Sequence, residues 1–246
     1  MNQKEIIVFD EIAKVLNNKE VIELIGIDNF NINNKSNVSM LIKKHLSSTT
    51  IYDSNILKDL NICLKFVSVN KELKAFESIS FPSSSLKNLL FESWDSNEPW
   101  EQAQFKKIIM STFIFIPIIK NKFKGKFNNI SEWKFGEISI WKTSNEDLVK
   151  IGKEWALAKA IVTKGVILNK EVYGKGFRIK NNLIKQSQTN YIHLRPHGIN
   201  SLDIDKPYLE YTNNKIEICK QSFWLNKKYI NEILKEYRWK INSRGK

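Results

Sequence analysis

The residues best suited to specific chemistry lie late in the chain, at Arg195-Pro196-His197 and at Trp224. Four of the 39 basic residues are arginines, which leaves 35 lysines. A lysine contacts phosphate as a point charge, whereas an arginine presents a planar fork that can donate two parallel hydrogen bonds to one base. A scarce arginine in a short motif therefore predicts base recognition at Arg195. The triplet is also compatible with an ordinary surface turn, and Phe223-Trp224-Leu225 with an ordinary core strand.

The charge of the chain indicates a polyanionic partner. It carries 39 basic and 26 acidic residues, a formal net charge of +13. This excess goes beyond what solubility requires and makes nucleic acid the first candidate. A low-GC coding sequence would also produce a lysine bias without any function, so a protein-interaction module with incidental charge stays open as an alternative.

Cysteine usage and hydropathy exclude several classes of protein. Cys63 and Cys219 lack CxxC spacing, so neither a zinc site nor a disulfide framework is expected. Residues 1–5 lack the apolar core of a signal peptide, and no apolar run reaches the roughly 18 residues that a membrane span needs. We expect a cytoplasmic protein without membrane contact.

Hydrophobic spacing predicts mixed α/β order. Helices are expected at residues 4–17, 21–27, 36–46 with a cap near Ser36, 83–91, 100–109, 144–165 with Ser144 and Asp147 as a capping box, and 227–237. Strands are expected at residues 61–69, 111–119, 135–141, 191–194 and 215–219. No internal repeat or linker divides the chain, and we expect one α/β domain over residues 1–246, with 1–30 as its helical N-terminal part.

Three blocks carry a resemblance to a known family, in the family's order. They are residues 35–46, residues 61–67, and the pair formed by His193-Leu194-Arg195-Pro196-His197 and residues 220–226. The chain resembles the MutH / Sau-three-A family of GATC-specific endonucleases, in which such blocks form an accessory active-site helix, the catalytic Glu-x-Lys strand and the base-reading segments. The resemblance implies a restriction-endonuclease-like fold, with a mixed central sheet flanked by helices.

By this resemblance the chain binds double-stranded DNA at GATC or a related site. It implies that Arg195, Pro196 and His197 enter the groove and that Trp224 occupies the position of an aromatic that senses adenine. An arginine suits guanine because its fork can donate to both O6 and N7 in the major groove. We also expect DNA contacts from three lysines: Lys35, Lys220 and Lys227.

The resemblance breaks at the catalytic centre. Nucleases of this class hold Mg²⁺ with two carboxylates and use a lysine beside the attacking water. Lys65 matches the family lysine, but Cys63 replaces the metal-binding glutamate, Ile56 lies where the aspartate belongs, and Lys43 replaces the accessory glutamate. A thiol is a soft ligand and a lysine repels a cation, so no catalytic residues, metal or other cofactor are expected. Lys65 and Lys43 either contact a phosphate or are simply solvated.

A vacant site of this kind is similar to the non-catalytic C-terminal effector domain of the Sau-three-A enzyme. The main hypothesis is therefore a DNA-binding pseudo-nuclease that serves restriction-modification or related DNA defence as an allosteric effector or partner subunit. Its partner would be a catalytically active nuclease or a second copy of the chain.

The competing hypothesis is an active Mg²⁺-dependent restriction endonuclease or nickase. Asp59 followed by Glu72-Leu73-Lys74 satisfies the loose pattern of an aspartate, a spacer and Glu-x-Lys. Acid-x-Lys should arise by chance roughly three or four times in a chain of this composition. The triplet also lies beyond the predicted strand of residues 61–69, whereas a catalytic pair should lie on it.

Overall fold

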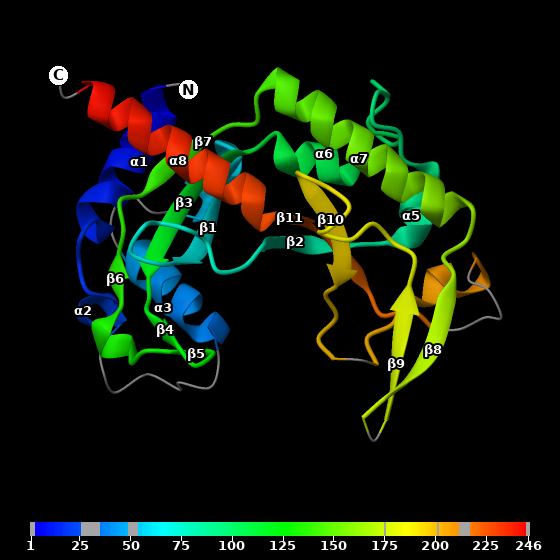
Figure 1. Cartoon of the computed structure of the whole chain (residues 1–246). Helices are drawn as coiled ribbons and strands as arrows, with labels where there is room; N and C mark the ends of the chain where they lie inside the picture. Colours follow the sequence, from blue (N-terminus) through cyan, green and yellow to red (C-terminus); the bar gives the residue numbers. More distant parts are fainter. Residues whose placement is uncertain are drawn as a thin grey trace. The chain divides into compact units, whose positions relative to one another are not determined.

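The chain divides into two compact units, each built of helices and strands (Figure 1). The computed structural model describes residues 3–25, 35–48, 54–174, 176–200, 202–211 and 217–244. Unit 1 comprises Met1–Glu77, Ser111–Lys142 and Ile230–Lys246, and unit 2 comprises Ser78–Met110 and Thr143–Tyr229. The single-domain organisation expected from the sequence stays a prediction.

Unit 1 is built on a four-stranded mixed sheet flanked by helices. β1 lies parallel to β3, and β6 and β7 pair with β3 in the antiparallel direction. The elements of unit 1 are α1 (Gln3–Leu16), α2 (Val21–Ile25), α3 (Lys35–Ser47), α4 (Ser54–Asp59), β1 (Ile62–Val69), β3 (Thr112–Ile119), β4 (Lys122–Phe123), β5 (Lys126–Phe127), the 3-10 helix η1 (Ile130–Glu132), β6 (Lys134–Phe135) and β7 (Ser139–Trp141). The mixed α/β class that the sequence predicts is confirmed.

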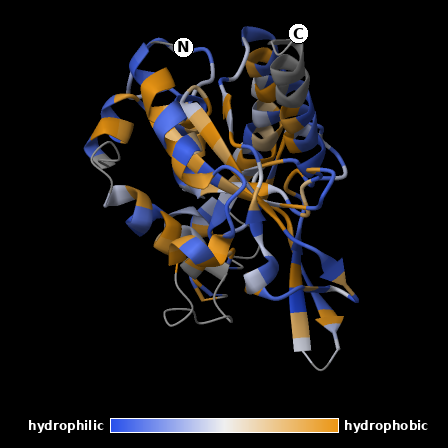
Figure 2. Cartoon of the chain, turned by 90° about the vertical axis from the view of Figure 1, so that its left-hand side faces the viewer, coloured by the Kyte–Doolittle hydropathy of each residue, from blue (hydrophilic) through white to orange (hydrophobic). Residues whose placement is uncertain are grey.

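The core of unit 1 forms where the N-terminal helices cover one face of this sheet. Val8, Ile12 and Leu16 recur every four residues along α1 and are buried, as expected of the apolar stripe of an amphipathic helix. They share a core cluster with Ile114 and Ile116 of the central strand β3. Figure 2 shows the corresponding alternation of hydrophobic and hydrophilic bands along the helices of this unit.

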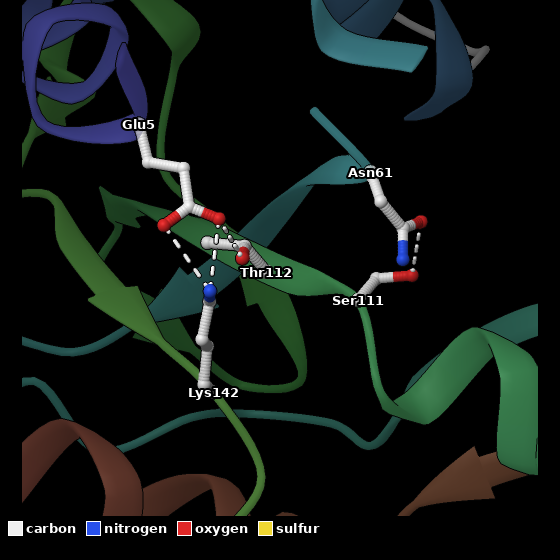
Figure 3. A network of polar contacts seen from close by, with 5 residues as sticks. All are labelled: Glu5, Asn61, Ser111, Thr112 and Lys142. Atoms are coloured by element: carbon white, nitrogen blue, oxygen red, sulfur yellow. Dashed lines mark hydrogen bonds and ion pairs between the residues drawn. The ribbon is translucent and has the colours of Figure 1, made fainter. Parts of the chain in front are cut away.

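A buried carboxylate fastens α1 to the sheet (Figure 3). Glu5 accepts a hydrogen bond from the Thr112 hydroxyl at 2.9 Å, and the Lys142 ammonium lies 2.9 Å from Glu5 Oε1 and 3.1 Å from Oε2. The Glu5 side chain is 4% exposed and that of Lys142 is 44% exposed. The ion pair therefore joins a desolvated anion to a cation that keeps much of its water.

Unit 2 contains a three-stranded antiparallel sheet in the order β10-β11-β2 and a separate two-stranded ribbon, β8-β9. Its elements are β2 (Ile79–Ser84), α5 (Leu86–Phe91), α6 (Gln104–Ile109), α7 (Asn145–Thr163), β8 (Leu168–Tyr173), β9 (Gly176–Asn181), β10 (Ile192–Pro196), the 3-10 helix η2 (Lys206–Tyr211) and β11 (Gln221–Leu225). α8 (Lys227–Arg244) begins in unit 2, and its residues from Ile230 belong to unit 1.

The long helix α7 begins and ends as its sequence predicts. Ser144 accepts a hydrogen bond from the backbone N–H of Asp147 at its start. Gly165, just after its end, has φ +87°, and a side chain there would collide with the Tyr211 carbonyl oxygen. Neither α7 nor any other helix in the described part of the chain is long and apolar enough to cross a membrane.

Several element boundaries differ from the sequence prediction. Ser83 belongs to β2 rather than to a helix, because this segment pairs with β11; α5 starts only after Ser85, which caps it. The strand expected at 135–141 is interrupted after Phe135, and both pieces pair with β3. The strand expected at 215–219 is wrong for its described part, where Cys219 forms only an isolated bridge. Residues 26–27 and 215–216 of the expected elements lie outside the described residues.

Candidate functional site

The strand pair β10-β11 places Arg195 and Trp224 on one face of the unit 2 sheet. His193 lies opposite Trp224, and Arg195 lies opposite Ser222. Because side chains alternate along a strand and opposite residues share a face, these four residues lie on the same face. The other face is apolar and includes Phe223, whose ring stacks on that of Phe105 with centroids 4.5 Å apart. The apolar face therefore packs against α6, and the opposite face presents polar side chains.

Trp224 is the centre of the polar face. The Arg195 guanidinium lies 5.0 Å from the centroid of the indole ring, in a cation-π contact. The ring of His197 meets the indole edge to face at 5.5 Å, and that of His193 stacks near it at 6.3 Å. Arg195 and His197 are exposed, whereas Trp224 is half-buried. The structure therefore brings together three of the side chains predicted for base contact; Pro196 is exposed beside them.

His193 is a structural part of this face. Its Nδ1 lies 2.5 Å from Asn226 Oδ1, while Asn226 Nδ2 donates to the carbonyl oxygen of Thr189 at 2.8 Å. Since the amide oxygen of Asn226 must accept, His193 carries its proton on Nδ1. Burial lowers the pKa of His193, and the Arg195 charge lowers it further against the opposing effect of the Asn226 bond. The ring is therefore neutral at neutral pH and adds no charge beside Arg195.

A carboxylate that the sequence gave no reason to select anchors the start of β10. Glu154 on α7 accepts hydrogen bonds from the backbone N–H groups of Asn190, Tyr191 and Ile192 at 2.7, 3.0 and 2.8 Å. The residue is 9% exposed. These three bonds hold the start of β10 against α7, and Arg195 follows three residues after the last of them.

The loop after β10 is tied to the segment before β11. His197 N–H donates to the Lys220 carbonyl at 2.8 Å, and the Lys220 ammonium pairs with Asp203 at 2.7 Å. The hydrogen bond and charge of Asp203 raise the pKa of Lys220. Lys220, a predicted DNA contact, therefore already has an anionic partner. Lys227 is exposed and is the first residue of α8.

On the face of β11 that carries Arg195, two buried polar atoms have unfilled hydrogen-bonding capacity. Ser222 Oγ and Trp224 Nε1 have no hydrogen-bond partner among the residues that the structure describes. Buried polar groups are normally paired, so exceptions need a reason such as a water or ligand atom. Both atoms belong to residues on the face that carries Arg195.

The second group of predicted residues lies in unit 1 on the edge strand β1. Cys63 and Lys65 are two positions apart and share a face of that strand, and both are partly buried. Burial lowers the pKa of Lys65 to about 8; the positive charge of Lys43 on α3 contributes in the same direction and Cys63 opposes it. Lys43, Cys63 and Lys65 therefore lie within electrostatic reach of one another.

We expect replacement of Lys65 by methionine to stabilise the protein at neutral pH by about 1–2 kcal/mol, less than the full pKa shift would give because the side chain keeps some water. The folded-state pKa lies below the unfolded value of 10.5, so the burial cost is complete below pH 8. The free energy of unfolding of the wild type should therefore rise from pH 8 to 10.5, and its difference from that of Lys65→Met should disappear. Urea denaturation over this pH range measures both quantities.

The matched control for that prediction is Lys58→Met, because Lys58 on α4 is exposed. Its free energy of unfolding should stay parallel to that of the wild type over the same pH range. A stability difference for Lys65→Met that did not change with pH would show that lost packing, not the buried charge, sets the effect.

The remaining predicted positions do not combine into a metal site. Ile56 lies on α4 and is 37% exposed. Asp59 ends α4 before β1, while Glu72 and Lys74 follow β1 in a turn, so the eight-residue strand, roughly 23 Å long, separates the two acids. The described residues contain no group of three His, Cys, Asp or Glu that could hold a metal ion.

Lys35 is the first residue of α3, in unit 1, whereas Arg195 and Trp224 belong to unit 2. Lys35 therefore lies outside the unit that contains the other predicted DNA-contact residues. A contact from Lys35 to DNA stays a prediction.

Comparison with known proteins relates the chain to a restriction enzyme. It is 28% identical over 198 residues to the type II restriction enzyme Sau3AI of Staphylococcus aureus. The match covers 72% of this chain and 38% of the enzyme, so the chain spans well under half the length of the curated relative. No protein-family profile matches the chain.

Proposed function

We propose that this chain is a sequence-specific double-stranded-DNA-binding protein with a MutH-like, restriction-endonuclease-like fold that recognises GATC or a related site. The observation that carries the proposal is the exposed Arg195 guanidinium over Trp224, on a strand fixed by Glu154. A guanidinium group that is already oriented loses little conformational entropy when it donates hydrogen bonds to the edge of a guanine base. The similarity to a type II restriction enzyme and the +13 charge support the same class of partner.

We further propose that the chain has no nuclease activity of its own and serves as an effector or partner subunit in restriction-modification or related DNA defence. Cys63 and Lys43 stand near Lys65 where a Mg²⁺ centre would need carboxylates. Lys43 adds a second positive charge within reach of Lys65, which disfavours a metal ion but suits a phosphate.

The test is cleavage of a labelled duplex with one GATC site, incubated with excess protein and Mg²⁺ and read on a denaturing gel. We expect the duplex to stay intact while a gel shift shows preference for GATC over a permuted site. A known GATC endonuclease on the same duplex provides the positive control, and EDTA the negative one. Site-specific, EDTA-sensitive product would overturn the inactive assignment.

A further inference from the structure

The β8-β9 ribbon is an exposed element for which the proposed function gives no role. It projects from the rest of unit 2, in the direction in which β10 runs (Figure 1). Every described residue of both strands is exposed except Leu168, which is buried, and Asn181, which is half-buried. A two-stranded ribbon without a covered face is only marginally stable by itself. We therefore expect a binding partner to cover its exposed side chains.

The register of the ribbon separates its side chains into two kinds of face. Lys170 lies opposite Ile179 and Val172 opposite Phe177, which makes one face apolar around a single lysine. Val172 is 78% exposed and Phe177 is 66% exposed. Figure 2 shows hydrophobic residues on this ribbon at the lower right of the view. Such a face is unfavourable in water and is expected to be covered when the protein acts.

The opposite face is charged and amphipathic. Glu171 lies opposite Arg178, and Tyr173 is on the same side. The Arg178 guanidinium lies 5.7 Å from the Tyr173 ring centroid, and Glu171 forms an ion pair with Lys180 at 2.5 Å. Since that pair neutralises the one acid of the two strands, Arg178 here and Lys170 on the apolar face supply a net positive charge.

The base of the ribbon is fastened beside Arg195. Asn182, just after β9, accepts a hydrogen bond from the Ile167 N–H, just before β8, at 3.0 Å. Two residues further, the Ile184 carbonyl accepts from the Leu194 N–H at 3.1 Å. Leu194 immediately precedes Arg195 on β10, so the ribbon and the proposed base-reading strand share a hydrogen-bonded support.

We infer that the β8-β9 ribbon is a second DNA-contacting element that enters the major groove next to the bases contacted by Arg195; this rests on the proposed function. The major groove admits a two-stranded β-ribbon, and apolar side chains there contact thymine methyl groups. Val172 and Phe177 face the bases. Lys170, whose ammonium lies 4.3 Å from the Phe177 ring centroid, contacts phosphate from the same face, and Arg178 does so from the opposite face. A second copy is the less suitable occupant, because two cationic ribbons repel each other.

The apolar contact is tested with Val172→Ser/Phe177→Ser on a duplex whose A·T-rich flanks carry either thymine or deoxyuracil. Wild-type protein should bind the thymine duplex about fourfold more tightly per contacted methyl group. The double variant should bind both duplexes equally and more weakly than the wild type. Val149→Ser/Leu157→Ser, two comparably exposed residues of α7, is the matched control and should behave as the wild type.

The phosphate contacts are tested separately with Lys170→Ala/Arg178→Ala, measured over a series of salt concentrations. Each lost phosphate contact should reduce the slope of log K against log salt by about 0.9, so a reduction of about 2 is expected. Lys153→Ala/Lys164→Ala removes two exposed charges of α7 or its end and should leave the slope unchanged. Lys170→Ala/Arg178→Ala also keeps the inference testable if Val172→Ser/Phe177→Ser does not fold.

The outcomes separate this inference from the function on which it rests. Failure of wild-type protein to bind duplex DNA would overturn the proposed function and the inference together. Normal wild-type binding, with sequence preference lost in Arg195→Ala but both ribbon variants binding like wild type, would overturn the inference alone. A ribbon variant with unchanged DNA affinity but an altered mass in solution would show that the ribbon binds another protein copy instead.

Discussion

Arg195→Ala should lower the preference of the protein for its recognition site over a permuted site by about 1–3 kcal/mol, roughly 5- to 150-fold. The alanine removes both donors of the guanidinium fork, while the many lysines that attract DNA non-specifically remain. Affinity for unrelated sequences should therefore fall little. Fluorescence anisotropy with both duplexes at one fixed salt concentration measures the ratio directly.

Arg195→Lys is the sharper control, because it keeps the charge but cannot donate to a guanine edge with the same fork. It should retain non-specific affinity fully and still lose most of the preference. Arg195 is exposed, so both variants should unfold like the wild type. Equal weakening on all sequences would reassign Arg195 to phosphate contact and remove the main support for base reading.

The effect expected at Arg195 depends on how rigidly its strand is held. Glu154 ties the start of β10 to α7, and the bond between His193 and Asn226 ties its middle to the end of β11. The indole of Trp224 then supports the guanidinium from one side. Because these restraints exist before any ligand binds, little conformational entropy remains to be lost on contact with a base.

Elements with strong local signals were predicted well from the sequence. α1 and α7 follow from apolar spacing and, for α7, from Ser144 and Gly165 at its ends. The buried strand β3 follows from its continuous apolar run. In each case the deciding interactions lie within the element or one turn beyond it, which is the range over which periodicity and capping residues act.

Long-range pairing could not be predicted in the same way. β2 is a strand because it completes the sheet beside β11, far along the chain, and its serines and Pro82 give no strong strand pattern of their own. The carboxylate of Glu154 likewise acts on backbone that only the tertiary fold brings near. The β8-β9 hairpin did carry a usable signal, since glycines at positions 174 and 176 flank its turn.

The candidate site was predicted mainly by resemblance, although the scarcity of arginine had already indicated Arg195. That reasoning selected Arg195, His197 and Trp224, and the structure brings their side chains together. It also selected Lys43, Cys63 and Lys65, which come within electrostatic reach of one another although Lys43 is on a different element. Their roles in DNA binding stay predictions, because proximity alone does not identify a ligand.

The ion pair of Glu5 allows the largest predicted change in stability. Lys142→Met should lower the free energy of unfolding by about 3 kcal/mol, because it removes the Lys142 cation from the buried Glu5 carboxylate. Glu5→Gln should cost only about 1 kcal/mol, since the abandoned Lys142 ammonium is 44% exposed and regains water. Urea denaturation followed by tryptophan fluorescence would compare the two variants under identical conditions.

The asymmetry between these variants distinguishes a desolvated anion from a simple attractive pair. If attraction alone mattered, removing either partner would cost the same. The double variant Glu5→Gln/Lys142→Met should therefore be more stable than Lys142→Met alone, because neutralising Glu5 removes a buried charge that has lost Lys142, while Thr112 keeps a hydrogen-bond acceptor. A double variant that lost the sum of both single effects would mean that Glu5 is solvated in the folded state and that α1 is held to the sheet by its apolar stripe alone.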